Sequence, residues 1–82
     1  MSNDASDIAA MAEQVWRALM PHVPGDDPLR ADVAEYIEAG EWGIACEAMA
    51  ILAKRYGQDG WAKAALEPVM TAAMMAEEED PT

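Results

Sequence analysis

The sequence predicts an all-α fold, a single domain built as a four-helix bundle. Alanine, the strongest helix former and a residue depleted in strands, occurs 18 times in 82 positions, whereas β-branched residues are few. Apolar residues make up 52% of the chain, which favours a folded core over disorder. A chain of this length is expected to form one domain with one modest core.

The first helix is expected over residues 5–20. Asp4 or Ser6 can cap its start, and Pro21 ends it. Apolar residues recur at intervals of three and four over three turns, which is the pattern of a helix with one buried face. These residues are Ile8, Met11, Ala12, Val15, Trp16, Leu19 and Met20.

A loop and a second helix follow. The segment 21–28 holds three prolines and a glycine, which predicts a loop. Asp27 followed by Pro28 is typical of a helix start, because aspartate caps the helix and proline suits its first position. The second helix is expected over residues 28–39, with Gly40 as its left-handed C-terminal cap. Its inward-facing residues are predicted to be Leu29, Val33, Tyr36 and Ile37.

The third helix is expected over residues 41–56, with Gly57 as its cap. A second apolar stripe, made of Ile44, Ala48 and Ile51, accompanies its main apolar face. Because a helix that is apolar on most sides is a buried one, we expect it at the centre of the bundle. The main face consists of Trp42, Ala45, Cys46, Met49, Leu52, Ala53 and Tyr56.

The fourth helix is expected over residues 60–76, with Asp59 as its cap. A proline inside a helix removes a backbone hydrogen bond and clashes with the preceding turn, at a cost of about 3 kcal/mol. We therefore expect Pro68 to kink this helix, or to split it into two short helices that meet at Glu67. The last residues, 77–82, form a block of like charges and are expected to be a disordered acidic tail.

The sequence contains no recognisable motif for catalysis or cofactor binding. His22 is the only histidine and has no second ligand at a spacing suited to a metal. Cys46 is the only cysteine, so it can form no disulfide within the chain and is predicted to be a small buried side chain. The glycines occur singly, without the pattern of a phosphate-binding loop. We expect a non-enzymatic protein without catalytic residues, metal ion or cofactor.

The chain is strongly acidic, with 16 acids against five bases and a net charge of −11. Nucleic acids and anionic membranes bind proteins through lysine and arginine. An acidic chain with few of these residues is therefore a poor direct partner for either. Neither a signal peptide nor an apolar run close to 18 residues is present, which predicts a cytoplasmic protein. A basic protein is the expected partner, because opposite charge speeds encounter and selects the target. An acidic surface that serves solubility alone is the alternative.

The acids are concentrated between Asp26 and Glu47. This stretch holds seven acids and a single base, Arg30, while other bases cluster at positions 54, 55 and 63. We expect Tyr36 to lie in the core, whereas Trp42 can belong either to the core or to an interface. We predict a partner-binding surface with Trp42 as its aromatic anchor, since aromatic residues are favoured at interfaces. Its carboxylates are Asp32, Glu35, Glu38 and Glu41 at the centre, and Asp26, Asp27 and Glu47 at the edge.

The stretch from Val33 to Gly57, VAEYIEAGEWGIACEAMAILAKRYG, resembles the small bacterial immunity proteins of the MafI type and the related colicin D immunity-like group. The matching positions are Tyr36, Ala39, Gly40, Glu41, Trp42, Ala45 and Glu47. Pro68 and the proline-rich loop depart from that pattern. The resemblance implies a four-helix bundle whose acidic face blocks the basic cleft of a cognate toxin, often a nuclease, with carboxylates in place of substrate phosphates.

Two other functions remain open from the sequence. A phage-encoded anti-CRISPR protein that mimics nucleic acid would have the same size and charge. A helical adaptor or dimerisation module would instead bind through apolar surface, and whether this chain forms a homodimer is left open. Salt separates these functions, because mimicry weakens strongly as ionic strength rises and an apolar interface does not.

Overall fold

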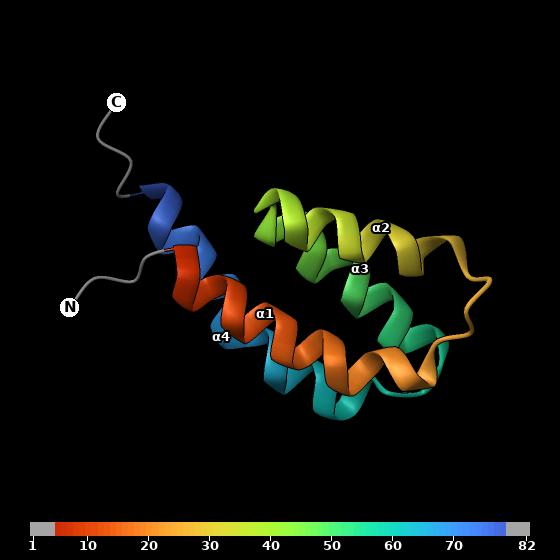
Figure 1. Cartoon of the computed structure of the whole chain (residues 1–82). Coiled ribbons are helices and arrows are strands. Elements are labelled where there is room, and N and C mark those ends of the chain that lie inside the picture. Colours follow the sequence, from red (N-terminus) through yellow and green to blue (C-terminus); the bar gives the residue numbers. More distant parts are fainter. Residues whose placement is uncertain (1–4, 79–82) are drawn as a thin grey trace.

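A computed structural model of the chain describes residues 5–78, with the side chains of residues 7–75. This part of the chain forms four α-helices and no strand, so the predicted all-α fold is confirmed (Figure 1). A short 3-10 helix, η1, follows the first of them. The elements are α1 (Ala5–Leu19), η1 (Met20–His22), α2 (Pro28–Ala39), α3 (Trp42–Arg55) and α4 (Asp59–Glu78).

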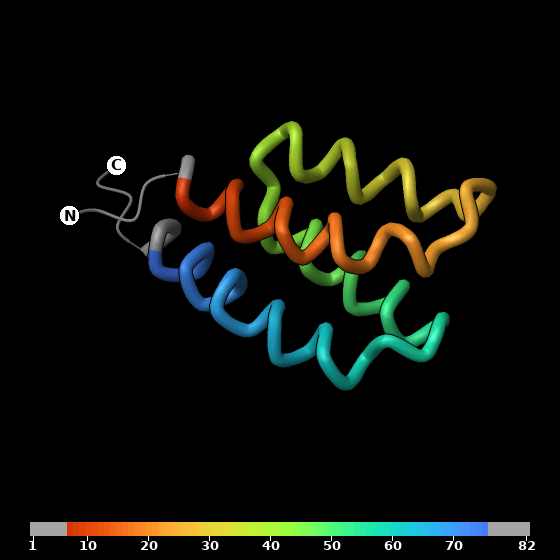
Figure 2. The backbone as a smooth tube through the Cα atoms, turned by 60° about the horizontal axis from the view of Figure 1, so that its bottom comes forward, coloured from red at the N-terminus to blue at the C-terminus, as the bar shows by residue number. Residues whose placement is uncertain are grey.

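Helix α3 packs most extensively on α4 and on α2, and α1 packs on α4 and α3 (Figures 1 and 2). Helix α3 contacts α1, α2 and α4, so it holds the central place that its apolar composition predicted. The start of α1 and the end of α4 lie at the same end of the bundle. None of the described helices combines the length and the apolar character needed to span a membrane.

The core takes residues from all four helices. Alanines at positions 12, 45 and 53 are almost fully buried. Such small side chains allow neighbouring helices to pack closely. The largest fully buried side chains are Ile8, Leu19, Val33, Cys46, Met49, Leu52 and Val69. Burial of these apolar groups is the main force that holds so small a domain together.

The turn between α2 and α3 depends on Gly40. This residue has φ +77°, the left-handed conformation that its position after the helix predicted. Its N–H donates to the carbonyl of Ile37, and the N–H of Glu41 donates to the carbonyl of Tyr36. The turn therefore satisfies backbone groups at the end of α2 and directs the chain into α3.

Replacing Gly40 with alanine is expected to lower the free energy of unfolding by about 1–2 kcal/mol, because a side chain is strained at positive φ. Gly43 is the matched control. It lies in the first turn of α3 without positive φ, and an added Cβ there meets open space. Gly43→Ala is expected to leave stability unchanged or slightly raised. Urea unfolding of both variants, followed by circular dichroism, measures the difference; equal effects would show that the backbone conformation of Gly40 is unimportant.

Three expectations about α4 need correction. The helix is one continuous segment through Pro68, so the predicted alternative of two short helices is wrong. Pro68 and Ala64 are both exposed, and water can bind the Ala64 carbonyl that Pro68 leaves without a backbone donor. Asp59 is the first helical residue rather than a cap before the helix, and the acidic tail does not begin at residue 77, because residues 77–78 belong to α4. Residues 79–82 of the predicted tail lie outside the described part.

The second apolar stripe of α3 is only partly buried. Ala48 is in the core, but Ile44 and Ile51 are 48% and 51% exposed. Helix α3 is therefore central, as predicted, but its outer side faces away from its three neighbours and stays open.

Candidate protein-binding surface

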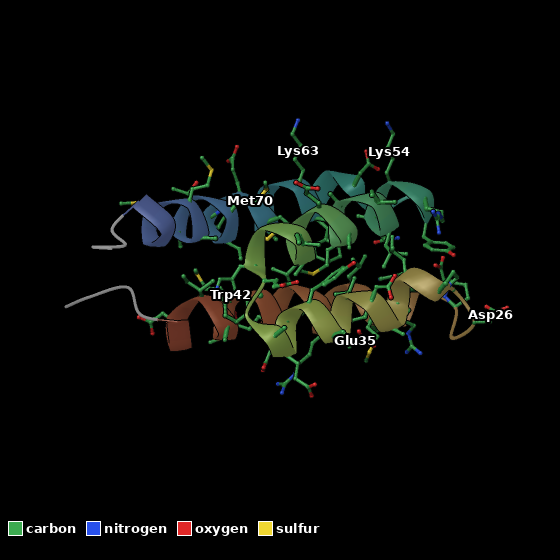
Figure 3. The ribbon with its side chains drawn as sticks, turned by 90° about the horizontal axis from the view of Figure 1, so that it is seen from above. Asp26, Glu35, Trp42, Lys54, Lys63 and Met70 are labelled. Atoms are coloured by element: carbon green, nitrogen blue, oxygen red, sulfur yellow. The ribbon has the colours of Figure 1, made fainter. Side chains whose placement is uncertain are left out.

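Helix α2 separates its apolar and acidic side chains. Val33 and Ile37 are buried against the bundle, whereas Glu35 and Glu38 are exposed. Asp32 is half-buried at the flank of the same helix. Residues three apart lie on neighbouring positions of one helix side, so the three acids form a stripe along α2. In Figure 3, Glu35 lies at α2, in the half of the molecule away from Lys54 and Lys63.

The turn after α2 extends this stripe. Glu41 is exposed immediately beyond the Gly40 cap. Trp42, the first residue of α3, is half-buried and packs against the core, so its ring is fixed while part of it reaches solvent. Tyr36 is also half-buried and packs against the core, as predicted. We call Asp32, Glu35, Glu38 and Glu41 the acidic surface.

Asp26 and Glu47 lie apart from the acidic surface. Asp26 is exposed in the loop before α2, at the far end of the bundle from Trp42 (Figure 3). Glu47 is exposed on the outer side of α3, on another helix. The structure therefore brings together the central carboxylates of the predicted surface, while these two edge positions belong to other parts of the molecule.

Asp27 is buried and stabilises the contact between two helices. Its side chain is 4% exposed, and it caps α2 by accepting a hydrogen bond from the Leu29 N–H at 3.0 Å. Arg55 Nη1 donates to its two carboxylate oxygens at 2.9 and 3.2 Å, and the hydroxyl of Tyr56 donates to Oδ2. Asp27 thus joins the start of α2 to the end of α3. Its carboxylate is fully engaged, so we do not include it in the acidic surface.

The hydrogen bond from Tyr56 is the main cause that lowers the pKa of Asp27, with the Leu29 N–H and Arg55 adding to it and burial opposing them. A carboxylate whose pKa is lower in the folded state stabilises the fold above its unfolded pKa of about 4, and this contribution is lost as the pH falls. Replacing Asp27 with asparagine is therefore expected to lower the thermal midpoint at pH 7. The difference from the unsubstituted protein should shrink as the pH falls below about 4.

The control for this prediction is Asp26→Asn, which removes the same charge from the neighbouring exposed residue. Thermal unfolding between about pH 3 and pH 7 compares the two variants. A gap between Asp27→Asn and the unsubstituted protein that stays constant over this range would contradict the linkage to Asp27 ionisation.

The basic residues are mostly separated from the acidic surface. Lys54 and Lys63 point out of the bundle on the side opposite Glu35 (Figure 3). Arg55 is paired with Asp27. Arg17 lines, with Glu38, a shallow groove of about 340 Å³ between α1 and α2. Arg30 lies on α2 itself, two residues before Asp32. The resulting charge distribution gives one negative side and one side that carries lysines.

The described residues contain no group of three or more His, Cys, Asp or Glu side chains placed to hold a metal ion. Cys46 is buried, and burial raises the pKa of its thiol to about 11. At neutral pH this thiol is protonated and therefore a poor nucleophile.

Comparison with protein-family models, with curated proteins and with solved structures gave no significant match. The class that the fold and the surface define is a small all-α domain with an acidic side and an opposite lysine-bearing side.

Proposed function

We propose that this protein is a small non-catalytic inhibitor that binds a basic protein through its acidic surface. The observation that carries the proposal is the line of carboxylates on the outside of α2, with Glu35 and Glu38 exposed and Lys54 and Lys63 on the opposite side. A surface that served solubility alone would have no need to separate the charges in this way. In a chain of net charge −11, the arrangement gives a basic partner one preferred direction of approach.

Carboxylates spaced along α2 can take the place of backbone phosphates. Acids three residues apart on a helix are separated by about 4.5 Å along its axis. A strand of duplex DNA carries one phosphate per about 3.4 Å along its axis. The two charge densities are similar, so a cleft of lysines and arginines that binds a nucleic-acid strand can also bind this helix.

The ordered helix also favours binding. The acidic residues are held on a regular helix that is capped by Asp27 at its start and by Gly40 at its end. Little conformational entropy is then lost when the partner binds. Trp42, packed at the end of the stripe, offers a fixed aromatic contact beside the charges.

The resemblance of residues 33–57 to immunity proteins favours a nuclease toxin as the target, which such a protein would neutralise in the cytoplasm. A CRISPR effector complex is the other basic, nucleic-acid-binding target with the same chemistry. Both targets present a cleft that normally holds phosphates, so the acidic surface itself does not distinguish them.

Affinity capture from a lysate of the source organism, at low and at high salt, tests the proposal. A basic nucleic-acid-processing protein that binds at low salt and is released by high salt is the expected result, because exposed charge pairs are screened. Mass spectrometry of the captured protein then decides between a toxin and a CRISPR complex. A partner that stays bound at high salt would contradict recognition through the acidic surface.

A further inference from the structure

The apolar surface of the described residues is concentrated on two helices. Within residues 7–75, every large apolar side chain that is exposed belongs to α3 or α4, and none belongs to α1 or α2. These side chains are Ile44, Ile51, Trp61, Met70, Met74 and Met75. Single exposed apolar groups need no explanation, whereas apolar groups that line one continuous groove form a candidate interface.

Of these side chains, Met70 lines a groove of about 430 Å³ between α3 and α4. Met75 lines a different groove, which faces Met11 of α1. The apolar lining of the α3–α4 groove comes from Ala50 and Ala53 on α3 and from Ala62, Leu66 and Met70 on α4. Met74, which is 60% exposed, lies one turn beyond Met70 on the same side of α4. Ala50 and Met70 are the exposed members of this lining. The small alanine allows close approach of another helix, and the flexible methionine adapts to the shape of what it contacts.

The charges beside this groove are arranged by sign along its length. Lys54 and Lys63 line the end near the α3–α4 turn and point out on the same side (Figure 3). Glu67 lies one turn after Lys63 on α4, and Glu47 lies two turns before Lys54 on α3. Because α3 and α4 run in opposite directions, both glutamates are displaced from the lysines toward the same end (Figure 2). The groove therefore has a basic end and an acidic end.

Asp59 is the one acid at the basic end of the groove. It lies in the first turn of α4, where a negative charge complements the helix dipole. With it included, the two lysines and three acids beside the groove sum to −1, whereas the whole chain carries −11. This is the side on which two copies of the chain can approach with little like-charge repulsion.

We propose that the α3–α4 face binds a second copy of this chain in a two-fold symmetric dimer. A two-fold axis that lies in the interface, perpendicular to the length of the groove, places the basic end of one copy over the acidic end of the other. The same contact between opposite charges then forms twice, once at each end. The apolar side chains of the two grooves are buried between them. The acidic surface on the opposite side stays free, and the dimer presents two such surfaces. This proposal does not depend on the proposed function.

Sedimentation velocity of the full chain over about a hundredfold range of concentration tests the dimer. The unsubstituted protein is expected to shift from monomer to dimer as concentration rises. The pair Lys54→Glu and Lys63→Glu makes both ends of the groove acidic, and the pair Glu47→Lys and Glu67→Lys makes both ends basic. Each doubly substituted protein alone is expected to dimerise at least about tenfold more weakly, because like charges then face each other.

An equimolar mixture of the two doubly substituted proteins is expected to recover the dimer as a heterodimer. Net charge alone does not explain this pattern, because one pair of changes makes the chain more negative and the other makes it less negative. All four residues are exposed, and circular dichroism checks that each protein is folded. A chain that stays monomeric at every concentration, larger open-ended assemblies, or a mixture that does not recover the dimer would overturn the proposal.

Discussion

Replacing Glu35 and Glu38 with lysine is expected to weaken binding to the basic partner at least about tenfold without unfolding the protein. Both side chains are exposed on α2 and lie at the centre of the acidic surface, so the change reverses the charge that the partner meets. Close charge pairs across an interface can contribute more than about 1.4 kcal/mol, which corresponds to a factor of ten in affinity. Isothermal titration calorimetry with the captured partner measures the loss.

The helical content of the same variant provides the control. Neither residue is in the core, so the circular dichroism spectrum is expected to match that of the unsubstituted protein. An unchanged affinity together with an unchanged spectrum would remove Glu35 and Glu38 from the binding surface. If the helical circular dichroism signal were lost, the affinity would be measured instead with the milder Glu35→Gln and Glu38→Gln pair.

Replacing Leu52 with alanine is expected to cost about 2–5 kcal/mol of the free energy of unfolding. Leu52 is fully buried on α3, the helix that contacts the other three, and the smaller side chain would leave a cavity at their meeting point. Domains of this size are stable by only about 4–12 kcal/mol, so the loss is a large fraction of the total. A fall of at least about 10 °C in the thermal midpoint is the expected readout.

The neighbouring residue supplies a matched control. Ile51 is 51% exposed on the outer side of the same helix, and Ile51→Ala is expected to change stability by no more than about 0.5 kcal/mol. Both variants are compared at low protein concentration, so that self-association does not contribute. Similar losses at positions 51 and 52 would contradict the orientation of α3 in the bundle.

The elements that the sequence predicted well are those with local causes. The cap made by Asp27 and Pro28 and the left-handed Gly40 are both decided by residues within one turn of the helix end. The exposed positions of Glu35 and Glu38 follow from the buried Val33 and Ile37 on the opposite side of α2. The helix ends accordingly differ from the predicted ones by one or two residues, within the variation expected for such boundaries.

The features that the sequence did not predict depend on contacts between distant segments. Asp27 meets Arg55 and Tyr56, which are 28 and 29 residues away, and no local pattern indicated that pairing. Periodicity identified Ile44 and Ile51 as apolar, but it does not say whether another helix covers them. With only four helices, α3 has three neighbours and one open side.

Pro68 shows that a local penalty can be outweighed by tertiary packing. An interior proline predicted a kink or a break, and the break is excluded because α4 continues from Asp59 to Glu78. Buried residues on either side of it, Leu66 and Val69, hold the helix against the bundle, while Pro68 itself faces solvent. The burial of these side chains offsets the cost of the missing hydrogen bond.

The most direct test of the acidic surface separates the position of a charge from its amount. The pair Glu35→Gln and Glu38→Gln, and the pair Ala64→Lys and Thr71→Lys, each shift the net charge of −11 by two, to −9. The first pair lies on α2, and the second lies at exposed positions of α4. Calorimetric affinities of both proteins for the captured partner should therefore differ: we expect a clear loss for the α2 pair and little change for the α4 pair. Equal losses would show that the partner responds to total charge, and that the acidic surface on α2 is not its binding site.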